Sequence, residues 1–173
     1  MNSTITRNGF WSALLLIGLF AIPLLFIGLP EPDDFMASEI VGHLFILVSL
    51  IFVFLGMKQY REANGGAFSY WKAVKVGLLI TIFPAVAFGL YNLLYVEVLD
   101  PDFMTKYAEY TIEQRGIGKS ADEITKIRQA VTEEVKMFDN SLIKFLVMFL
   151  SVFVMGAIVS LVSAFFVKKI EAA

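Results

Sequence analysis

The chain contains no cysteine and a single histidine, His43. The absence of cysteine excludes disulfide bonds and thiolate metal sites. A zinc site needs at least three protein ligands, and only Glu39 lies on the same predicted helix face as His43. We therefore expect no metal site and no cofactor.

Catalytic motifs are also missing. No Walker loop, Gly-x-Ser-x-Gly or His-Glu-x-x-His pattern occurs. Gly65-Gly66 has no strand before it and no phosphate-gripping Lys-Ser/Thr after it, so it indicates a turn. No candidate nucleophile stands beside a candidate base. We expect no catalytic residue and a protein that is not an enzyme.

Charge is scarce. Charged residues make up 17% of the 173 residues, against about 25% in a typical soluble domain. The formal net charge is −2, which argues against nucleic acid as a partner, because phosphate binding requires a basic surface. The mean hydropathy of +0.74 is that of a protein dominated by apolar segments.

Long apolar stretches account for that value. Four of them can each cross the roughly 30 Å of a bilayer core as a helix, at about 10–29, 40–57, 73–96 and 142–167. The first has no Ala-x-Ala cleavage pattern and is interpreted as an uncleaved span rather than a signal peptide. The sequence predicts an all-α, polytopic membrane protein with a single domain over 1–173. We expect this domain to be a bundle of four transmembrane helices in contact with the lipid bilayer.

Basic residues in the short flanks predict the orientation. Arg7 precedes the first span, three basic residues lie in the link at 58–72, and Lys168 and Lys169 follow the fourth span, whereas the link at 30–39 has none. The positive-inside rule therefore predicts that both termini are cytoplasmic.

The segment between the third and fourth spans is predicted to be helical. Ser120 and Glu123 match a capping box, and apolar residues at helical spacing follow them. A shorter helix is expected between Asp100 and Gly116. We expect a short amphipathic helical extracytoplasmic cap at about 100–138, packed on the outer mouth of the bundle. Alternatively, it lies along the outer leaflet or forms a surface for a partner.

Small residues recur on one face of two spans, where they let helix backbones approach closely. They are Gly42, Ser49 and Gly56 in the second span, and Gly156, Ser160 and Ala164 in the fourth. We interpret both sets as packing faces inside the bundle. The alternative is an interface in a homo-oligomer.

Polar residues near the outer ends of the second and third spans form the candidate polar pocket, because such groups are costly in a membrane and mark function. They are His43, Tyr91 and Asn92. The alternative interpretation is an interfacial histidine, a belt of aromatic residues and one interhelical hydrogen bond.

The link between the second and third spans carries a motif of glycine, tyrosine and basic residues. It reads GMKQYRE at 56–62 and GGAFSY at 65–70, followed by Ala73 and Gly77. This motif, the LDPDF step at 99–103 and the order of the spans resemble a four-helix bacterial membrane-protein family common in Bacteroidetes, the domain of unknown function 4199. The resemblance implies a bacterial inner-membrane location. It supplies no activity, ligand or catalytic residue that could be carried over to this chain.

Two functions remain open at this stage. The first is a non-enzymatic scaffold or modulator of another membrane protein in the cell envelope. The second is a small transporter or channel with a weakly polar site near the outer ends of spans two and three. An intramembrane enzyme would additionally require a water-filled cavity with converging acid and base groups.

Overall fold

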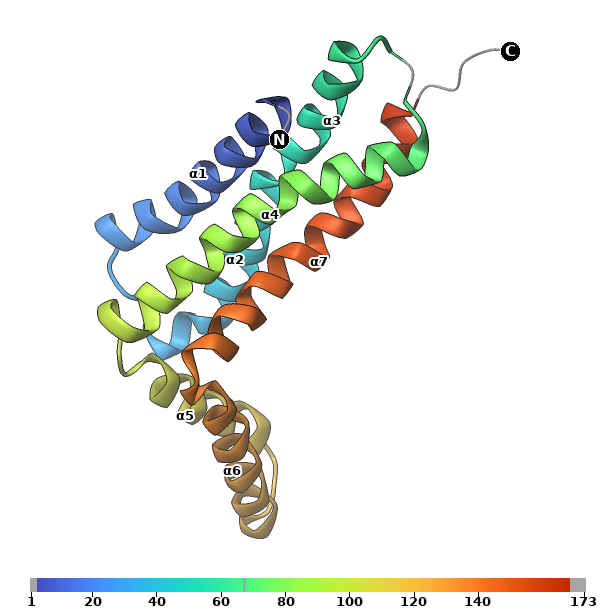
Figure 1. The fold of residues 1–173 in the computed structure, drawn as a ribbon. Coiled ribbons are helices and arrows are strands. Elements are labelled where there is room, and N and C mark those ends of the chain that lie inside the picture. Colours follow the sequence, from blue (N-terminus) through green and yellow to red (C-terminus); the bar gives the residue numbers. More distant parts are fainter. Residues whose placement is uncertain (1–2, 67, 169–173) are drawn as a thin grey trace.

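The computed structural model describes residues 3–66 and 68–168, and Figure 1 shows that this part of the chain is built from helices. Lys169, used above for the orientation, lies outside the described residues. The helices in chain order are α1 (Ser3–Phe26), α2 (Phe35–Ser49), α3 (Ile51–Ala63), α4 (Tyr70–Leu94), α5 (Phe103–Gly116), α6 (Ala121–Lys136) and α7 (Ser141–Val167). Three short turns join them: η1 (Pro32–Asp34), the π-helical η2 (Tyr95–Leu99) and η3 (Met137–Asp139).

Four helical segments are long and apolar enough to cross a membrane, as the sequence predicted. They are Ser3–Phe26, Pro32–Ala63, Tyr70–Leu99 and Ser141–Val167. The first begins earlier than expected and ends at Phe26 instead of continuing to residue 29. Gly28 then turns the chain with a φ of +99°, a conformation that favours glycine.

The outer surface of these spans is apolar. Phe26 is 85% exposed and Phe166 is 74% exposed, and many other large apolar side chains are exposed along the same helices. Contiguous exposure of this extent in water is unfavourable. Lipid chains are the solvent that these surfaces fit, which agrees with a membrane protein.

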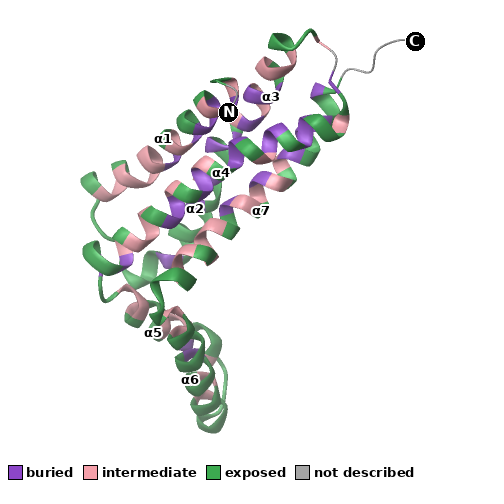
Figure 2. Cartoon of the chain, in the orientation of Figure 1, coloured by how far each residue is buried: buried purple, intermediate pink, exposed green. Residues whose placement is uncertain are grey.

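Helix α4 lies at the centre and packs against α1, α3 and α7. In its most apolar window 56% of the residues are buried, against 17% for α1 and for α7. Figure 2 shows the buried positions concentrated along α4 and on the helix faces turned toward it. Small side chains permit this packing, because Gly77 lies against Ser160 and Gly156 lies against Thr81.

The second span is broken at Leu50, whereas the sequence predicted one continuous helix over 40–57. The ψ angle of Leu50 is −2°, compared with about −42° in an α-helix. The Val53 amide donates to Leu50 O at 2.9 Å instead of to Ser49 O, its partner in a regular α-helix. The hydroxyl of Ser12 in α1 donates to Ser49 O at 2.8 Å, and both serines are fully buried. The break is thus satisfied by a neighbouring helix, as backbone irregularity inside a membrane requires.

We expect Ser12→Ala to destabilise the protein by about 1 kcal/mol, because Ser49 O would lose the hydrogen bond from Ser12 in an apolar interior. Thermal unfolding in a neutral detergent measures the effect. Ser151→Ala is the matched control, because the Ser151 hydroxyl donates to Val147 O inside its own regular helix. Equal losses for both variants would show that the Ser12 hydrogen bond has no special role.

Helices α5 and α6 form an antiparallel hairpin, called the arm below, that points away from the spans (Figure 1). The capping box is confirmed: the Glu123 amide donates to Ser120 Oγ at 3.4 Å, and the Ser120 amide donates to Glu123 Oε2 at 3.0 Å. The hydrogen bond from the Ser120 amide, followed by one that the Ser120 hydroxyl donates to Glu123 Oε2 at 2.9 Å, lowers the pKa of Glu123.

The placement of the arm differs from the expected cap. Helix α6 packs against α5 and η3, and only the first turns of α5 lie against the spans. Ile112 and Val131 are the buried apolar side chains of the arm, while most of its charged residues are exposed. The narrow apolar faces of the two arm helices are buried against each other, so little apolar surface of the arm is left to pack on the spans.

Candidate functional site

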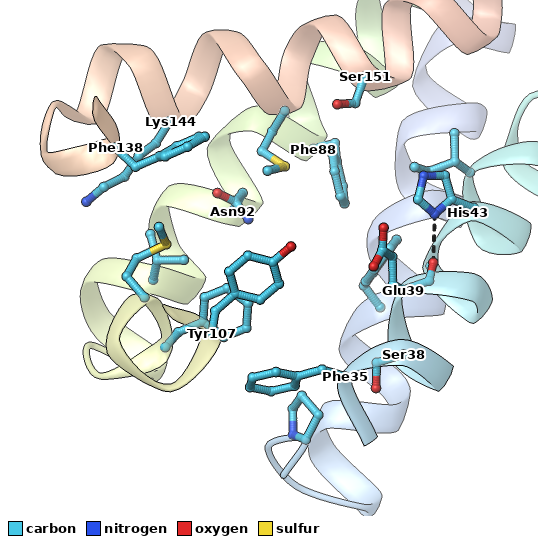
Figure 3. A pocket seen from close by; sticks show the side chains of 18 residues that line it. Phe35, Ser38, Glu39, His43, Phe88, Asn92, Tyr107, Phe138, Lys144 and Ser151 are labelled. Atoms are coloured by element: carbon cyan, nitrogen blue, oxygen red, sulfur yellow. Dashed lines mark hydrogen bonds between the residues drawn. The ribbon is translucent and has the colours of Figure 1, made fainter. Parts of the chain in front are cut away.

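A cavity of ≈ 460 Å³ lies where the spans meet the arm, and its walls come from α1, α2, α4, α5 and α7 (Figure 3). This volume falls within the roughly 300–1,000 Å³ typical of small-molecule sites. Its lining combines a large apolar surface with a few polar side chains. That combination is common in sites that bind an organic molecule in one orientation.

The deep wall of the cavity is apolar and aromatic. It contains Phe20 of α1, Ile46 of α2, Phe88 of α4 and Met148 of α7. The rings of Phe20 and Phe88 lie 5.1 Å apart, and Phe88 and Ile46 belong to the buried core. The packing of α1, α2 and α4 therefore gives this wall its shape.

Polar groups of α2 and α4 lie nearer the arm. The Glu39 carboxylate and the Asn92 amide both point toward the interior of the cavity in Figure 3. The ring of His43 also lines it, and its Nδ1 lies 2.7 Å from the backbone oxygen of Glu39. With a carbonyl as partner, Nδ1 carries the proton and Nε2 is left as an acceptor in the neutral ring.

The first turns of α5 form the wall on the arm side. Phe103, Met104 and Tyr107 line the cavity there. Phe35, at the start of α2, is 6% exposed and joins these turns to the spans, with ring centroids 5.5 Å from Phe103 and 6.2 Å from Tyr107. A molecule in the cavity would consequently touch the arm as well as the spans.

The two charged side chains of the cavity differ in their surroundings. Lys144 is paired with Glu97 at 3.3 Å, and the Ser141 hydroxyl donates to the same carboxylate oxygen at 2.6 Å. In Figure 3 the Lys144 amine points away from the cavity. Within residues 3–66 and 68–168, no cation pairs with Glu39. The carboxylate of Glu39 is therefore the uncompensated charge of the cavity.

The structure brings together two of the three residues of the candidate polar pocket. His43 and Asn92 line the cavity, while Tyr91 does not. The ring of Tyr91 packs instead against Phe20 at 5.7 Å and Tyr95 at 6.4 Å. Tyr91 directly precedes Asn92. Neighbouring residues are about 100° apart around a helix, so the two side chains leave α4 in different directions.

Sequence reasoning did not assign Tyr107, Ser151 or Lys144 to this site. Tyr107 comes from the arm, and its role depends on how the arm meets the spans. The sequence could have indicated Lys144, because Glu97 and Lys144 are charged residues at the facing ends of two consecutive spans. Such residues favour an ion pair once the spans are placed side by side.

The six small residues singled out above are all buried. A Cβ added at Gly42 would lie 3.3 Å from Phe20 Cζ, and one added at Gly56 would lie 2.5 Å from Ile80 Cδ1. Gly156 and Ser160 face α4, as described above. These contacts are all within the chain. Among the described residues, no group of three or more potential ligands is arranged to hold a metal ion.

A family model described as "Protein of unknown function (DUF4199)" matches residues 7–169. The match covers most of the first apolar span, the other three spans and the arm, and it confirms the resemblance carried by the motif at 56–77. No curated protein and no solved structure matches the chain.

Proposed function

The chain belongs to the DUF4199 family, and from that premise we propose that it is a non-enzymatic modulator of another membrane protein. One observation carries the proposal: the arm projects into the space beyond the spans while its first turns form a wall of the cavity. A molecule bound in the cavity would contact Phe103, Met104 and Tyr107, and so would bias the position of the arm. A partner protein bound to the arm would then respond to the change in the position of the arm.

We further propose a bacterial inner-membrane location with cytoplasmic termini and an extracytoplasmic arm. The basic residues of the short flanks support it. Arg7 donates to Gln59 at 2.8 Å and Arg61 donates to Val167 O at 3.0 Å, so these basic groups gather at the end of the spans opposite the arm. The positive-inside rule assigns such an end to the cytoplasm.

Photo-crosslinking in intact cells tests the modulator. A photoreactive amino acid replaces Gln129, an exposed residue of α6, and Asn64, an exposed residue at the opposite end, serves as the matched control. We expect a discrete adduct with one other protein from position 129 that saturates as the chain is overproduced. Adducts confined to this chain, at every expression level, would overturn the proposal.

A small transporter is the second candidate, and the break at Leu50 favours it. Transporter sites commonly lie beside discontinuous helices, and this break is four residues beyond Ile46 of the cavity wall. Against it, Val53 and Ile80 are fully buried and lie in the half of their spans that is farther from the arm. Flux of a fluorescent organic cation into liposomes that is lost in both His43→Leu and Asn92→Leu would favour the transporter.

A further inference from the structure

The cavity changes in polarity along its length. Glu39 and Ile46 lie seven residues apart on α2, and Lys144 and Ser151 lie seven residues apart on α7, so each pair spans about 10 Å of helix. Toward the arm, the lining includes Glu39, Asn92 and Tyr107. Toward the middle of the spans it consists mainly of Phe20, Ile46, Phe88 and Met148. A ligand that satisfies both ends has a polar head and an apolar body.

The cavity also opens toward the lipid-facing side. Five of its lining residues are exposed, among them Glu39 and His43 on α2 and Ser151 on α7. His43 lies about 12 Å from the start of α2 and Ser151 about 15 Å from the start of α7. Side chains that are exposed at that distance along an apolar span face hydrocarbon rather than water. An amphiphile already dissolved in the bilayer can therefore enter sideways between α2 and α7.

The charge distribution selects the head group. Lys144 is neutralised by Glu97, whereas the Glu39 carboxylate faces the cavity with no cation among the described residues. The rings of Phe35, Phe103 and Tyr107 lie at the same end and add the aromatic faces that attract an ammonium group. An anionic head group would be repelled by Glu39. A cationic one would gain a charge-assisted hydrogen bond.

We propose that this cavity binds a membrane amphiphile whose ammonium group pairs with Glu39 and whose apolar body lies against Phe20, Phe88 and Met148. Two sources offer this chemistry: a phospholipid with an ethanolamine head group, or a free amphipathic amine. The inference concerns the cavity alone and does not depend on the partner proposed for the arm. Failure of the photo-crosslinking experiment would leave it intact.

Native mass spectrometry of the full chain in a neutral maltoside detergent tests the proposal. The probes are dodecylammonium, dodecanol and dodecyl phosphate, which share one tail and differ in head-group charge. We expect dodecylammonium to bind at least about tenfold more tightly than the other two, since a hydrogen bond to a charged group is worth that much or more. Equal binding of the three probes would overturn the proposal.

Substitutions locate the binding. Glu39→Gln keeps the size of the side chain and removes its charge, and we expect it to abolish the preference for dodecylammonium. Glu133→Gln, on the exposed side of α6, is the matched control and leaves the preference unchanged. Ser151→Phe fills the cavity from α7 and weakens binding of every probe, with Glu39 intact. A preference that survives both Glu39→Gln and Ser151→Phe would show that the amine binds elsewhere.

A competition experiment identifies the source. Phosphatidylethanolamine that displaces dodecylammonium, where phosphatidylglycerol does not, identifies the lipid head group as the natural ligand. Displacement by neither phospholipid, with dodecylammonium binding still dependent on Glu39, identifies a free amphipathic amine.

Discussion

Replacing Gly156 with leucine is expected to destabilise the protein by about 3 kcal/mol or more, at the upper end of the range for overpacking. A Cβ at this position would overlap the side chain of Thr81 on α4. Thr81 is fully buried, and its hydroxyl donates to Gly77 O at 3.0 Å, so it has little freedom to turn away. The hydroxyl of Ser160 lies against Gly77 one turn along the same interface. Moving α7 away from Thr81 would also separate Ser160 from α4.

Thermal unfolding in neutral detergent, followed by circular dichroism, measures this loss. Gly18→Leu is the matched control, because no heavy atom lies within 4 Å of a Cβ built at Gly18 in α1. We expect the control to unfold within about 0.5 kcal/mol of the unmodified chain. A Gly156→Leu protein that is as stable as the control would contradict the packing of α4 against α7.

Replacing Lys106 with methionine is expected to loosen the base of the arm. Lys106 Nζ lies 2.8 Å from Asp100 Oδ1, and the Asp100 side chain is only 4% exposed. The second carboxylate oxygen, Oδ2, is buried without a hydrogen-bond partner among the described residues. Removing the lysine charge leaves a buried carboxylate uncompensated, which is strongly unfavourable. We expect amide hydrogen exchange in the first turns of α5 to accelerate by about tenfold or more.

Two controls separate the ion pair from general effects. Lys126→Met removes an exposed lysine of α6 and is expected to leave exchange in α5 unchanged. Asp100→Asn removes the buried charge itself and is expected to loosen α5 less than Lys106→Met. Equal effects of Lys106→Met and Lys126→Met would show that the ion pair does not hold the arm.

The same ion pair predicts a pH dependence. The hydrogen bond to Asp100 is the main cause that raises the pKa of Lys106 above its ordinary value of 10.5. A raised pKa in the folded state means that the contribution to stability is fully present below pH 10.5 and disappears as the pH rises through the raised value. Hydrogen exchange in α5 should therefore accelerate at strongly alkaline pH in the unmodified chain more than in Lys106→Met.

The sequence was sufficient where the governing interaction is local. Apolar length predicted the four spans, because a bilayer fixes how many residues a helix needs to cross it. The capping box at Ser120 and Glu123 depends on residues three apart, so it was visible without the fold. The same holds for the end of α5 near Gly116, where Gly118 follows with a φ of +72°.

Features that depend on distant residues were not predictable. The break at Leu50 occurs without a proline or glycine beside it, and the free carbonyl of Ser49 is satisfied by Ser12, 37 residues before Ser49. The arm meets the spans through contacts between distant residues, such as Phe35 with Phe103. In the cavity, the sequence indicated His43 and Asn92 because both are polar residues inside spans. It did not separate Asn92 from Tyr91, because choosing between neighbouring residues requires the rotation of α4.

The break at Leu50 and the ring contacts of Phe35 would allow α2 to act as a lever. The fifteen residues of α2 form a helix about 22 Å long. The hydrogen bond from Ser12 fixes the end at the break, and Phe35 at the other end packs among aromatic rings of α5. A tilt of about 10° at Leu50 would displace Phe35 by about 4 Å over that length. With such a tilt, the half of the span that carries Glu39 and His43 would transmit the binding of a molecule in the cavity to the arm.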